Sequence, residues 1–344
     1  MKVEISLGAI KRNSERIAKT VDKPLIPMLK ADAYGHGAAR VARAISAEYY
    51  GVATEEEGVP LREAGKQILV TAPSFSSVGL CRRYDMIPLI GDFDVAKRAA
   101  ALGVKRCHIK VNSGMNRLGF RPEDCREITL FLTRAGVKIE GAATHYKESS
   151  VQNVLSQNDA FRRAIRAIKN ALSDAGGEEK LVTSVTGCGA PFSGEFDYLR
   201  VGLALYGYPT DTVTKTLSLE KAMKVSSEVI KTKIIEEGET LGYSGVFRAP
   251  KRLKAYTVLG GYGDGVARSE VGRKVLSAGR RLMIAAVSMD SFEMISDHVD
   301  LKVGRRVIIL SKEADACYVA AKRGTIPYEV LLGYDVPRAE KVYV

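Results

Sequence analysis

Residues 24–46, PLIPMLKADAYGHGAARVARAIS, pass from a short apolar segment through a lysine and a Gly-His-Gly turn into an amphipathic stretch. This pattern predicts a βα unit, with a strand over 24–29 and a helix within 37–46. Lys30 stands where the strand ends. A lysine at a strand end is usually a solvated surface residue, so the rest of the chain must indicate whether this one is placed for chemistry.

Seven more strand-like segments follow this unit at intervals of roughly 20 to 30 residues, the spacing of repeated βα units. They are residues 49–54, 67–72, 86–91, 107–112, 138–146, 180–186 and 196–201. Amphipathic stretches lie between them, such as 93–102 and 160–177, and the second closes on a Gly pair suited to a helix C-terminus. Eight strands favour a TIM barrel over an open doubly wound sheet.

The pattern changes beyond residue 220, where alternating and β-branched segments are divided by Gly-rich turns. Such segments predict an all-β domain. We therefore expect an α/β protein in which a (β/α)8 TIM barrel over residues 1–220 precedes a C-terminal all-β domain over 221–344. The opening segment, residues 1–10, is also strand-like and is expected either to start the barrel or to pack with the β domain.

The composition favours a globular protein of the cytoplasm. The 344 residues are 46% hydrophobic and 27% charged, with no apolar run long enough for a membrane span and no signal-peptide pattern at the N-terminus. The five cysteines are scattered without CxxC spacing, which argues against disulfides and a metal site. The net charge of +12 is spread over short, interrupted basic groups, so we expect a solvated basic surface and no nucleic-acid partner.

Several polar residues follow predicted strands, at the barrel edge where TIM-barrel active sites lie. Lys30 follows the first strand, Arg117 comes shortly after the fifth, His145 ends the sixth and Gly187 ends the seventh. The segment 200–203 follows the eighth strand, where barrels often bind phosphate through backbone N–H groups. A lysine facing a phosphate pocket suggests pyridoxal phosphate, whose aldehyde condenses with an amine.

Seven short motifs, in order along nearly the whole chain, resemble those of the alanine racemase family. They are MLKADAYGHG (28–37), KVNSGMNRLGF (110–120), YLRVGLALYG (198–207), LGYSGVFRAP (241–250), GYGDG (261–265), VSMD (287–290) and IPYEVLLGYDVPR (326–338). Each motif alone is weak. The glycine run around Tyr262 has no βαβ unit beside it, so it does not indicate a dinucleotide site.

The resemblance implies a pyridoxal-phosphate-dependent amino-acid racemase that works as a homodimer with shared active sites. Lys30 matches the Schiff-base lysine, which is also one of two catalytic bases, and Tyr243 matches the other base, supplied by the partner subunit. Two bases are needed because one proton leaves one face of the substrate carbon and another arrives on the opposite face. A free tyrosine has a pKa of about 10, so this role requires cationic neighbours, for which Arg200 and Arg117 are candidates.

The resemblance also assigns binding roles. Arg200 matches the arginine against the pyridine nitrogen, where a guanidinium that holds its proton limits the cofactor's strength as an electron sink. Lys110 aligns with a lysine that is carbamylated in some members. The cofactor-binding residues it implies are Lys30, Tyr34, His145, Gly187, Arg200, Gly202, Leu203 and Tyr328, and the substrate-binding residues are Arg117, Tyr262 and Met289.

The sequence departs from the family pattern at three places. YKESS (146–150) follows His145 in place of the usual Phe-Ala, Gly187 replaces a serine and Ala286 replaces an arginine, whereas Arg268 and Asp264 are kept. These changes leave the proton-transfer pair intact and put the substrate in question: alanine first, with serine or a basic amino acid as the alternative. A barrel-fold decarboxylase and a non-catalytic pyridoxal-phosphate carrier are the other readings, and the carriers lack a β domain.

Overall fold

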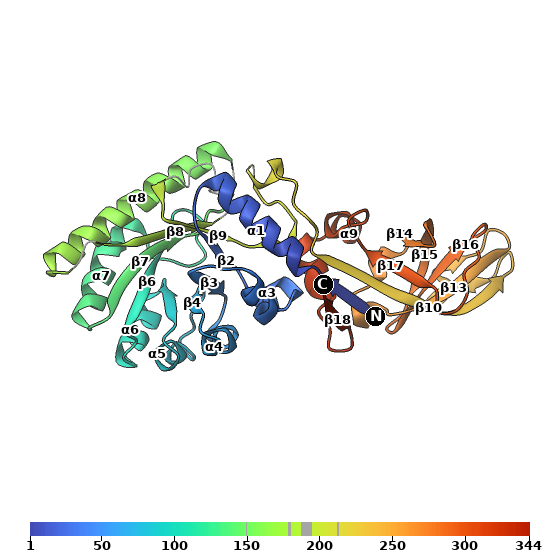
Figure 1. Ribbon diagram of the computed structural model, residues 1–344, viewed down its shortest axis with the longest axis horizontal. Coiled ribbons are helices and arrows are strands. Elements are labelled where there is room, and N and C mark those ends of the chain that lie inside the picture. Colours follow the sequence, from blue (N-terminus) through green and yellow to red (C-terminus); the bar gives the residue numbers. More distant parts are fainter. Residues whose placement is uncertain (149, 178–179, 187–194, 212) are drawn as a thin grey trace. The chain divides into compact units, whose positions relative to one another are not determined.

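The chain divides into two compact units, which are described in turn (Figure 1). The computed structural model describes residues 1–148, 150–177, 180–186, 195–211 and 213–344. The first unit consists of Ile10–Ala33 and Gly37–Glu220, and we call it the barrel unit. The second consists of Met1–Ala9, Tyr34–His36 and Lys221–Val344, and we call it the β unit.

The barrel unit is built on an eight-stranded parallel sheet in the order β2-β9-β8-β7-β6-β5-β4-β3. A parallel bridge between Met28, just after β2, and Gly51 of β3 closes the sheet. The strands are β2 (Leu25–Pro27), β3 (Tyr49–Val52), β4 (Gln67–Val70), β5 (Ile87–Ile90), β6 (Arg106–Val111), β7 (Lys138–Thr144), β8 (Val182–Thr186) and β9 (Tyr198–Val201). The predicted TIM barrel is confirmed, and each predicted segment supplies one strand.

Helices alternate with these strands, as the amphipathic stretches predicted. They are α1 (Leu7–Val21), α2 (Lys30–Gly35), α3 (Ala38–Ala44), α4 (Glu55–Glu63), α5 (Gly79–Arg83), α6 (Phe93–Ala101), α7 (Cys125–Arg134) and α8 (Val151–Asp174), with short 3-10 turns η1 (Pro122–Asp124), η3 (Leu203–Tyr206) and η4 (Thr214–Thr216). Asp92 caps α6 by accepting hydrogen bonds from the N–H groups of Asp94 (2.8 Å) and Val95 (3.1 Å). Helix α8 begins earlier than the predicted 160, and Gly176 follows its end at φ 72°.

The barrel strands are buried on both faces, which is why they read as short apolar runs rather than alternating ones. One cluster inside the barrel unit contains Ile26, Leu69, Ile87, Leu89 and Ala143, which come from four different strands. Packing of this kind holds the strand ends in fixed positions. The residues that follow those ends are therefore carried on a rigid support.

The β unit is built on a second eight-stranded sheet in the order β13-β16-β15-β14-β17-β10-β1-β18, and a further pairing joins its first strand, β13, to β10. Its strands are β1 (Lys2–Ile5), β10 (Met223–Ile235), β13 (Leu253–Leu259), β14 (Lys274–Ser277), β15 (Arg280–Val287), β16 (Ser291–Ser296), β17 (Arg306–Leu310) and β18 (Glu340–Tyr343). The opening strand β1 pairs antiparallel with β10 and parallel with β18. The first residues of the chain thus belong to this sheet.

Shorter elements complete the β unit. A two-stranded hairpin joins β11 (Thr240–Leu241) to β12 (Phe247–Arg248) through the turn η5 (Tyr243–Gly245). The turns η6 (Tyr262–Asp264) and η7 (Arg268–Glu270) follow β13, and the helices α9 (Ala316–Arg323) and α10 (Pro327–Gly333) precede β18. The predicted all-β domain is confirmed, with two short helices near its end.

Three further observations concern the described part of the chain only. None of its helices combines the length and the apolar character that crossing a bilayer requires. Its cysteines, Cys81, Cys107, Cys125 and Cys317, are free thiols. It holds no group of three His, Cys, Asp or Glu side chains arranged as metal ligands.

Candidate active site

Lys30 follows β2 at the carboxyl edge of the barrel sheet, where the sequence predicted it. The backbone before it is tied to both neighbouring strands, because Met28 N–H donates to Val201 O (2.8 Å) and Leu29 N–H donates to Gly51 O (2.7 Å). The start of the Lys30 side chain is therefore fixed by the closure of the barrel.

The environment of the Lys30 side chain favours its neutral form. Burial, the larger cause, and the nearby charge of Arg117 both lower the pKa of Lys30, whereas the carboxylate of Glu57 opposes them. A lower pKa increases the share of neutral amine near neutral pH, and the neutral amine is the form that attacks an aldehyde. Lys30 is thus suited to the role that the sequence predicted.

The turn after Lys30 has an unusual backbone. Residues 31–34 have φ values of 49°, 49°, 57° and 56°, although none is glycine. A left-handed conformation costs an L-residue about 1–2 kcal/mol. Part of the support comes from Asp32, whose carbonyl accepts from Gly37 N–H (2.8 Å) and whose Oδ1 accepts from Ala38 N–H (2.7 Å). Strain of this kind persists only where the surroundings enforce it, and it is concentrated at functional sites.

Arg117 lies on a tight loop between β6 and α7. Asn112 organises this loop: its Oδ1 accepts from the N–H groups of Gly114 (3.1 Å) and Asn116 (3.0 Å), and its Nδ2 donates to Asn116 Oδ1 (2.9 Å). The loop is closed by Gly119, because a Cβ there would lie 2.6 Å from Asn112 N. The exposed Arg117 is thereby held close enough to Lys30 to shift its pKa.

Arg200 is buried at the end of β9 with only 4% of its surface exposed. Its Nη1 donates to Ser184 O (3.0 Å) and Ser184 Oγ (2.5 Å), and its Nη2 donates to Thr144 O. Burial lowers the pKa of Arg200 to about 10. Sequence reasoning missed Thr144 and Ser184, although both are polar residues within predicted strands. They fix the plane of the guanidinium while using three of its five N–H groups.

The barrel unit gathers positive charge around these residues. Lys110 is buried, its Nζ donates to Thr71 O (2.7 Å), and burial followed by Arg200, Arg117 and Lys30 lowers its pKa to about 8. The pKa of His145 is lowered to about 3, again by burial first and then by neighbouring cations.

These shifts test whether the residues suit pyridoxal phosphate. The charges that shift Lys110 and His145 are all cations, so each positive group raises the free energy of the others. A bound anion relieves that repulsion, and pyridoxal phosphate is an anion with an aldehyde that an amine such as Lys30 can bind. The donor set of the barrel unit therefore fits this cofactor.

Two predicted phosphate ligands lie after β9. Gly202 precedes the turn η3 and Leu203 begins it. The N–H groups of a helix's first turn have no partner within that helix, so the chemistry suits an anion. Gly187 was also predicted to contact the cofactor, but it lies outside the described residues.

Tyr34 and Tyr328 are brought together in the β unit. Their ring centroids are 5.7 Å apart with the planes inclined by 53°. Tyr34 is buried, and Tyr328 lies in the first turn of α10. Two residues that the sequence places about three hundred positions apart, and that were predicted to share one ligand, are thus neighbours.

Tyr243 projects from the β11–β12 hairpin with 71% of its surface exposed. The residue before it, Gly242, has a φ of 76°, and a Cβ there would lie 2.6 Å from the Cβ of Ala286 and 2.9 Å from Val246 Cγ1. Only glycine fits this position, so the backbone that carries Tyr243 is held directly against β15. Ala286 itself is fully buried, packed beneath the hairpin.

Tyr262 and Met289 lie on two turns of the β unit that one arginine joins. Arg338 Nη2 donates to Asp264 Oδ2 (2.8 Å), and Arg338 Nη1 donates to Asp290 Oδ1 (2.7 Å). Asp264 ends the turn that begins at Tyr262, and Asp290 follows Met289. Both side chains are exposed, at 44% for Tyr262 and 53% for Met289. Sequence reasoning kept Asp264 but missed its partner Arg338.

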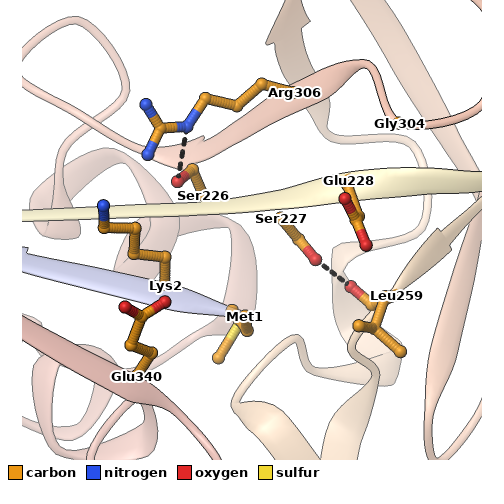
Figure 2. A pocket seen from close by; sticks show the side chains of 9 residues that line it. All are labelled: Met1, Lys2, Ser226, Ser227, Glu228, Leu259, Gly304, Arg306 and Glu340. Atoms are coloured by element: carbon orange, nitrogen blue, oxygen red, sulfur yellow. Dashed lines mark hydrogen bonds between the residues drawn. The ribbon is translucent and has the colours of Figure 1, made fainter.

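The β unit also contains surface cavities. One of them, with a volume of about 370 Å³, lies between β1, β10 and the ends of β13, β17 and β18, and its lining side chains are drawn in Figure 2. It is lined by Met1, Lys2, Ser226, Ser227, Glu228, Leu259, Gly304, Arg306 and Glu340. Ser226 and Ser227 already bond to Arg306 and Leu259, and none of the lining residues is a predicted site residue (Figure 2). Another, of about 360 Å³, is lined in part by Tyr243 and Arg268.

Comparison with known proteins decides the family. The family model described as alanine racemase, N-terminal domain, matches residues 5–210, and the one described as alanine racemase, C-terminal domain, matches residues 222–343. The chain belongs to the alanine racemase family. The resemblance found in the sequence motifs is therefore confirmed, and with it the isomerase class and the dependence on pyridoxal phosphate that characterise the family.

Individual members of the alanine racemase family align over the whole chain. "Alanine racemase" of Thermodesulfovibrio yellowstonii is 30% identical, covering 100% of this chain and 98% of the relative. Alanine racemase from Bacillus anthracis, solved with bound L-Ala-P, superposes with a TM-score of 0.87 at 25% identity, covering 100% of this chain and 94% of that one. Alanine racemase from Bartonella henselae, solved with covalently bound pyridoxal phosphate, gives 0.87 at 23% identity, with 100% and 99% covered.

Proposed function

We propose that this protein interconverts the enantiomers of a free amino acid, most specifically L- and D-alanine, with pyridoxal phosphate and two bases on opposite faces of the substrate. The observation that carries the proposal is the half-buried Lys30 with a lowered pKa, placed at the catalytic edge of the barrel among Lys110, His145 and Arg200. Relatives named alanine racemase over the full length support the choice of alanine.

Each barrel residue has one task in this proposal. Lys30 binds the cofactor's aldehyde carbon. The N–H groups that Arg200 does not use toward the described residues would be available to the pyridine nitrogen of the bound cofactor. His145 packs on the ring, and Gly202 and Leu203 donate backbone N–H groups to the phosphate, together with the hydroxyls of Tyr34 and Tyr328. When bound, the cofactor withdraws electron density from the substrate's α-carbon and so makes its proton removable.

The proton is moved by the chain's own residues. The Lys30 amine takes or returns the α-proton on one face, and the phenolic oxygen of Tyr243 does so on the other. Arg200 holds its own proton even when buried, so it leaves the ring nitrogen unprotonated and limits how far negative charge is withdrawn from the α-carbon. Return of the proton to that same carbon would then be favoured, and with it racemisation over transamination. Arg117 orients the substrate carboxylate.

The second base comes from the other subunit of a homodimer in this proposal. Tyr243, Tyr262 and Met289 are large side chains that the β unit leaves exposed. Exposed aromatic and thioether groups mark interaction surfaces when they gather on one part of a protein. One chain alone is then expected to be inactive.

The decisive experiment mixes two inactive variants. Tyr243→Phe keeps the ring but removes the proton-carrying oxygen, and we expect it to retain the cofactor's absorbance while racemisation falls by about 10²- to 10⁴-fold. Lys30→Ala is expected to lose covalent attachment of the cofactor. In heterodimers of the two, one of the two shared sites contains both Lys30 and Tyr243, so activity returns on mixing.

The matched control is Tyr318→Phe, which removes a hydroxyl from a tyrosine that is 41% exposed on α9. It is expected to racemise alanine like the unaltered protein. Full activity of Tyr243→Phe, or no recovery on mixing under conditions where heterodimers are detected by native mass spectrometry, would refute the two-base assignment across subunits.

Substrate choice needs its own measurement. Each of a set of single-enantiomer amino acids, including alanine, serine, lysine and arginine, is incubated with the holoprotein and analysed by chiral chromatography. Ala286 is the reason to include the larger ones, because the family pattern has an arginine at this position. Fastest racemisation of alanine is expected, and a faster rate with serine or a basic amino acid would reassign the substrate. A holoprotein that racemises none would favour the non-catalytic carrier.

A further inference from the structure

Glu57 connects two segments of the catalytic edge through one carboxylate. It lies in the first turn of α4, and its Oε1 accepts a hydrogen bond from Ala31 N–H (2.8 Å). Its Oε2 accepts from Ala53 N–H (2.8 Å), in the loop between β3 and α4. The carboxylate thus joins the turn that follows Lys30 to the neighbouring βα connection.

The bond to Ala31 is made at the start of the left-handed turn. Ala31 is the first of the four consecutive non-glycine residues with positive φ, and it directly follows Lys30. The Ala31 N–H belongs to the planar peptide group that joins Lys30 to Ala31, so its direction is fixed relative to the Cα of Lys30 by the ψ torsion of Lys30. Whatever holds the Ala31 N–H therefore also sets the direction in which the Lys30 side chain leaves the backbone.

We propose that Glu57 is a positioning residue of the active site, which holds the Lys30 side chain in its reactive direction by fixing the left-handed turn at Ala31. The inference rests on the proposed function, in which Lys30 is the reactive amine. Glu57 acts through Ala31 and takes no proton from the substrate.

Helix capping alone does not account for the arrangement. A glutamate in the first turn that accepts from a backbone N–H near the helix start is a familiar capping contact, and the bond to Ala53 is of that kind. The bond to Ala31 reaches 26 residues back along the chain to a different βα unit. Glu57 is also close enough to Lys30 for its charge to oppose the lowering of the Lys30 pKa by burial and Arg117.

The test compares Glu57→Gln with Glu56→Gln in the full-length holoprotein. Both substitutions remove one negative charge from the first turn of α4, so their effects on the helix dipole are matched. Both also replace a carboxylate oxygen with an amide NH₂, which cannot accept a hydrogen bond, but it is the Glu57 carboxylate that accepts from the N–H groups of Ala31 and Ala53. Glu57→Asp is the second variant: it keeps the charge, but its side chain is one methylene too short to reach both N–H groups.

Two readouts are needed. Hydrogen–deuterium exchange, followed by mass spectrometry without added substrate, is expected to be about tenfold faster over residues 30–37 in Glu57→Gln and Glu57→Asp than in Glu56→Gln. The kcat for alanine is expected to fall by about 10- to 100-fold in the same two variants, with KM changed by less than about threefold, since a misdirected amine weakens the reaction more than substrate binding.

The outcomes are distinct. Exchange over residues 30–37 and kcat that both match those of Glu56→Gln overturn the proposal. The proposal is also overturned if Glu57→Asp keeps its kcat and its slow exchange while Glu57→Gln loses both. The negative charge at residue 57 would then be enough, and the hydrogen bond to Ala31 would not be needed. The exchange readout does not depend on racemisation, so faster exchange over residues 30–37 in a protein that proves to have no racemase activity would refute the proposed function while the positioning contact stands.

Discussion

A buried histidine in the barrel is predicted to limit the protein's stability in acid. His108 lies in β6, is fully buried, and neither of its ring nitrogens has a hydrogen-bond partner in the described part of the chain. The ring fills the space above Gly141, where a Cβ would lie 2.6 Å from Nδ1, and it meets the edge of Tyr49 with centroids 6.5 Å apart. An imidazolium at this position would therefore be buried without a hydrogen-bond partner from the described residues.

The magnitude follows from the pKa of His108, which is lowered from 6.5 to about 3 by burial first and then by Arg200 and Arg106. Between those values the unfolded chain binds a proton at this residue and the native chain does not, so unfolding takes up a proton and stability falls as the pH falls. The contribution is fully present above pH 6.5. At about pH 4.5, two units lower, the loss is about 2.7 kcal/mol, at 1.36 kcal/mol per unit.

The perturbation is His108→Leu, which keeps a side chain of similar volume without a titrating group. Urea unfolding at about pH 7.5 and about pH 4.5 gives the change in free energy of unfolding with pH for each protein. This change is expected to be smaller in His108→Leu by about 2 to 3 kcal/mol. Penalties that do not depend on pH cancel within each protein, and the contribution of His145 is common to both.

His298→Asn is the matched control, because His298 is an imidazole whose side chain is 85% exposed. In this variant the change in free energy of unfolding between the two pH values is expected to stay within about 0.5 kcal/mol of that of the unaltered protein. If His108→Leu lost as much stability in acid as the unaltered protein does, the ring would have to be hydrated or hydrogen-bonded when protonated, and the reasoning from burial would be wrong.

Two further substitutions in the β unit are predicted to act by different routes. Gly242→Ala forces a Cβ against Ala286 at a φ of 76°, so the hairpin that carries the proposed second base, Tyr243, is expected to shift. The kcat is then expected to fall by at least about tenfold, whereas an unchanged kcat would mean that the hairpin adapts. The Nε of the buried Arg273 donates to Glu270 (2.5 Å), and Arg323 lies beside the same carboxylate, so Glu270→Gln leaves both guanidinium groups without it. Thermal and urea unfolding are expected to show a free energy of unfolding lower by about 3–5 kcal/mol. A decrease below about 1 kcal/mol would contradict this expectation.

The strands of both sheets could be predicted because their signal is local. Segments such as 67–72 and 86–91 are apolar runs between turn residues, and each became a strand of the barrel within two residues of its predicted ends. The start of α8 was the least accurate boundary, since residues 151–159 include several polar residues that weaken the apolar period the prediction relied on. Strand β1 was predicted as a strand, but its partners β10 and β18 lie hundreds of residues away.

The residues of the candidate site also divide into those with a signal in the local sequence and those without one. Lys30, Arg117 and Arg200 were predicted as site residues because reactive or basic side chains after barrel strands stand out and because the motifs around them match the family. Glu57 was missed, although the acidic run 55–57 directly after a predicted strand was a usable signal. A carboxylate at a helix start is more often a surface charge, and nothing in the sequence says that it accepts a hydrogen bond from Ala31.

The sequence by itself determined the two sheets and the family, and it predicted Lys30 as the reactive lysine, because periodicity and motif spacing are properties of neighbouring residues. Tertiary structure alone decided the electrostatics and the backbone geometry of the site. The lowered pKa values of Lys110 and His145 arise from burial and from cations on other strands, which no local pattern encodes. The left-handed turn after Lys30 opposes the local preference of its own residues, so only contacts from elsewhere in the fold, such as that of Glu57, can hold it.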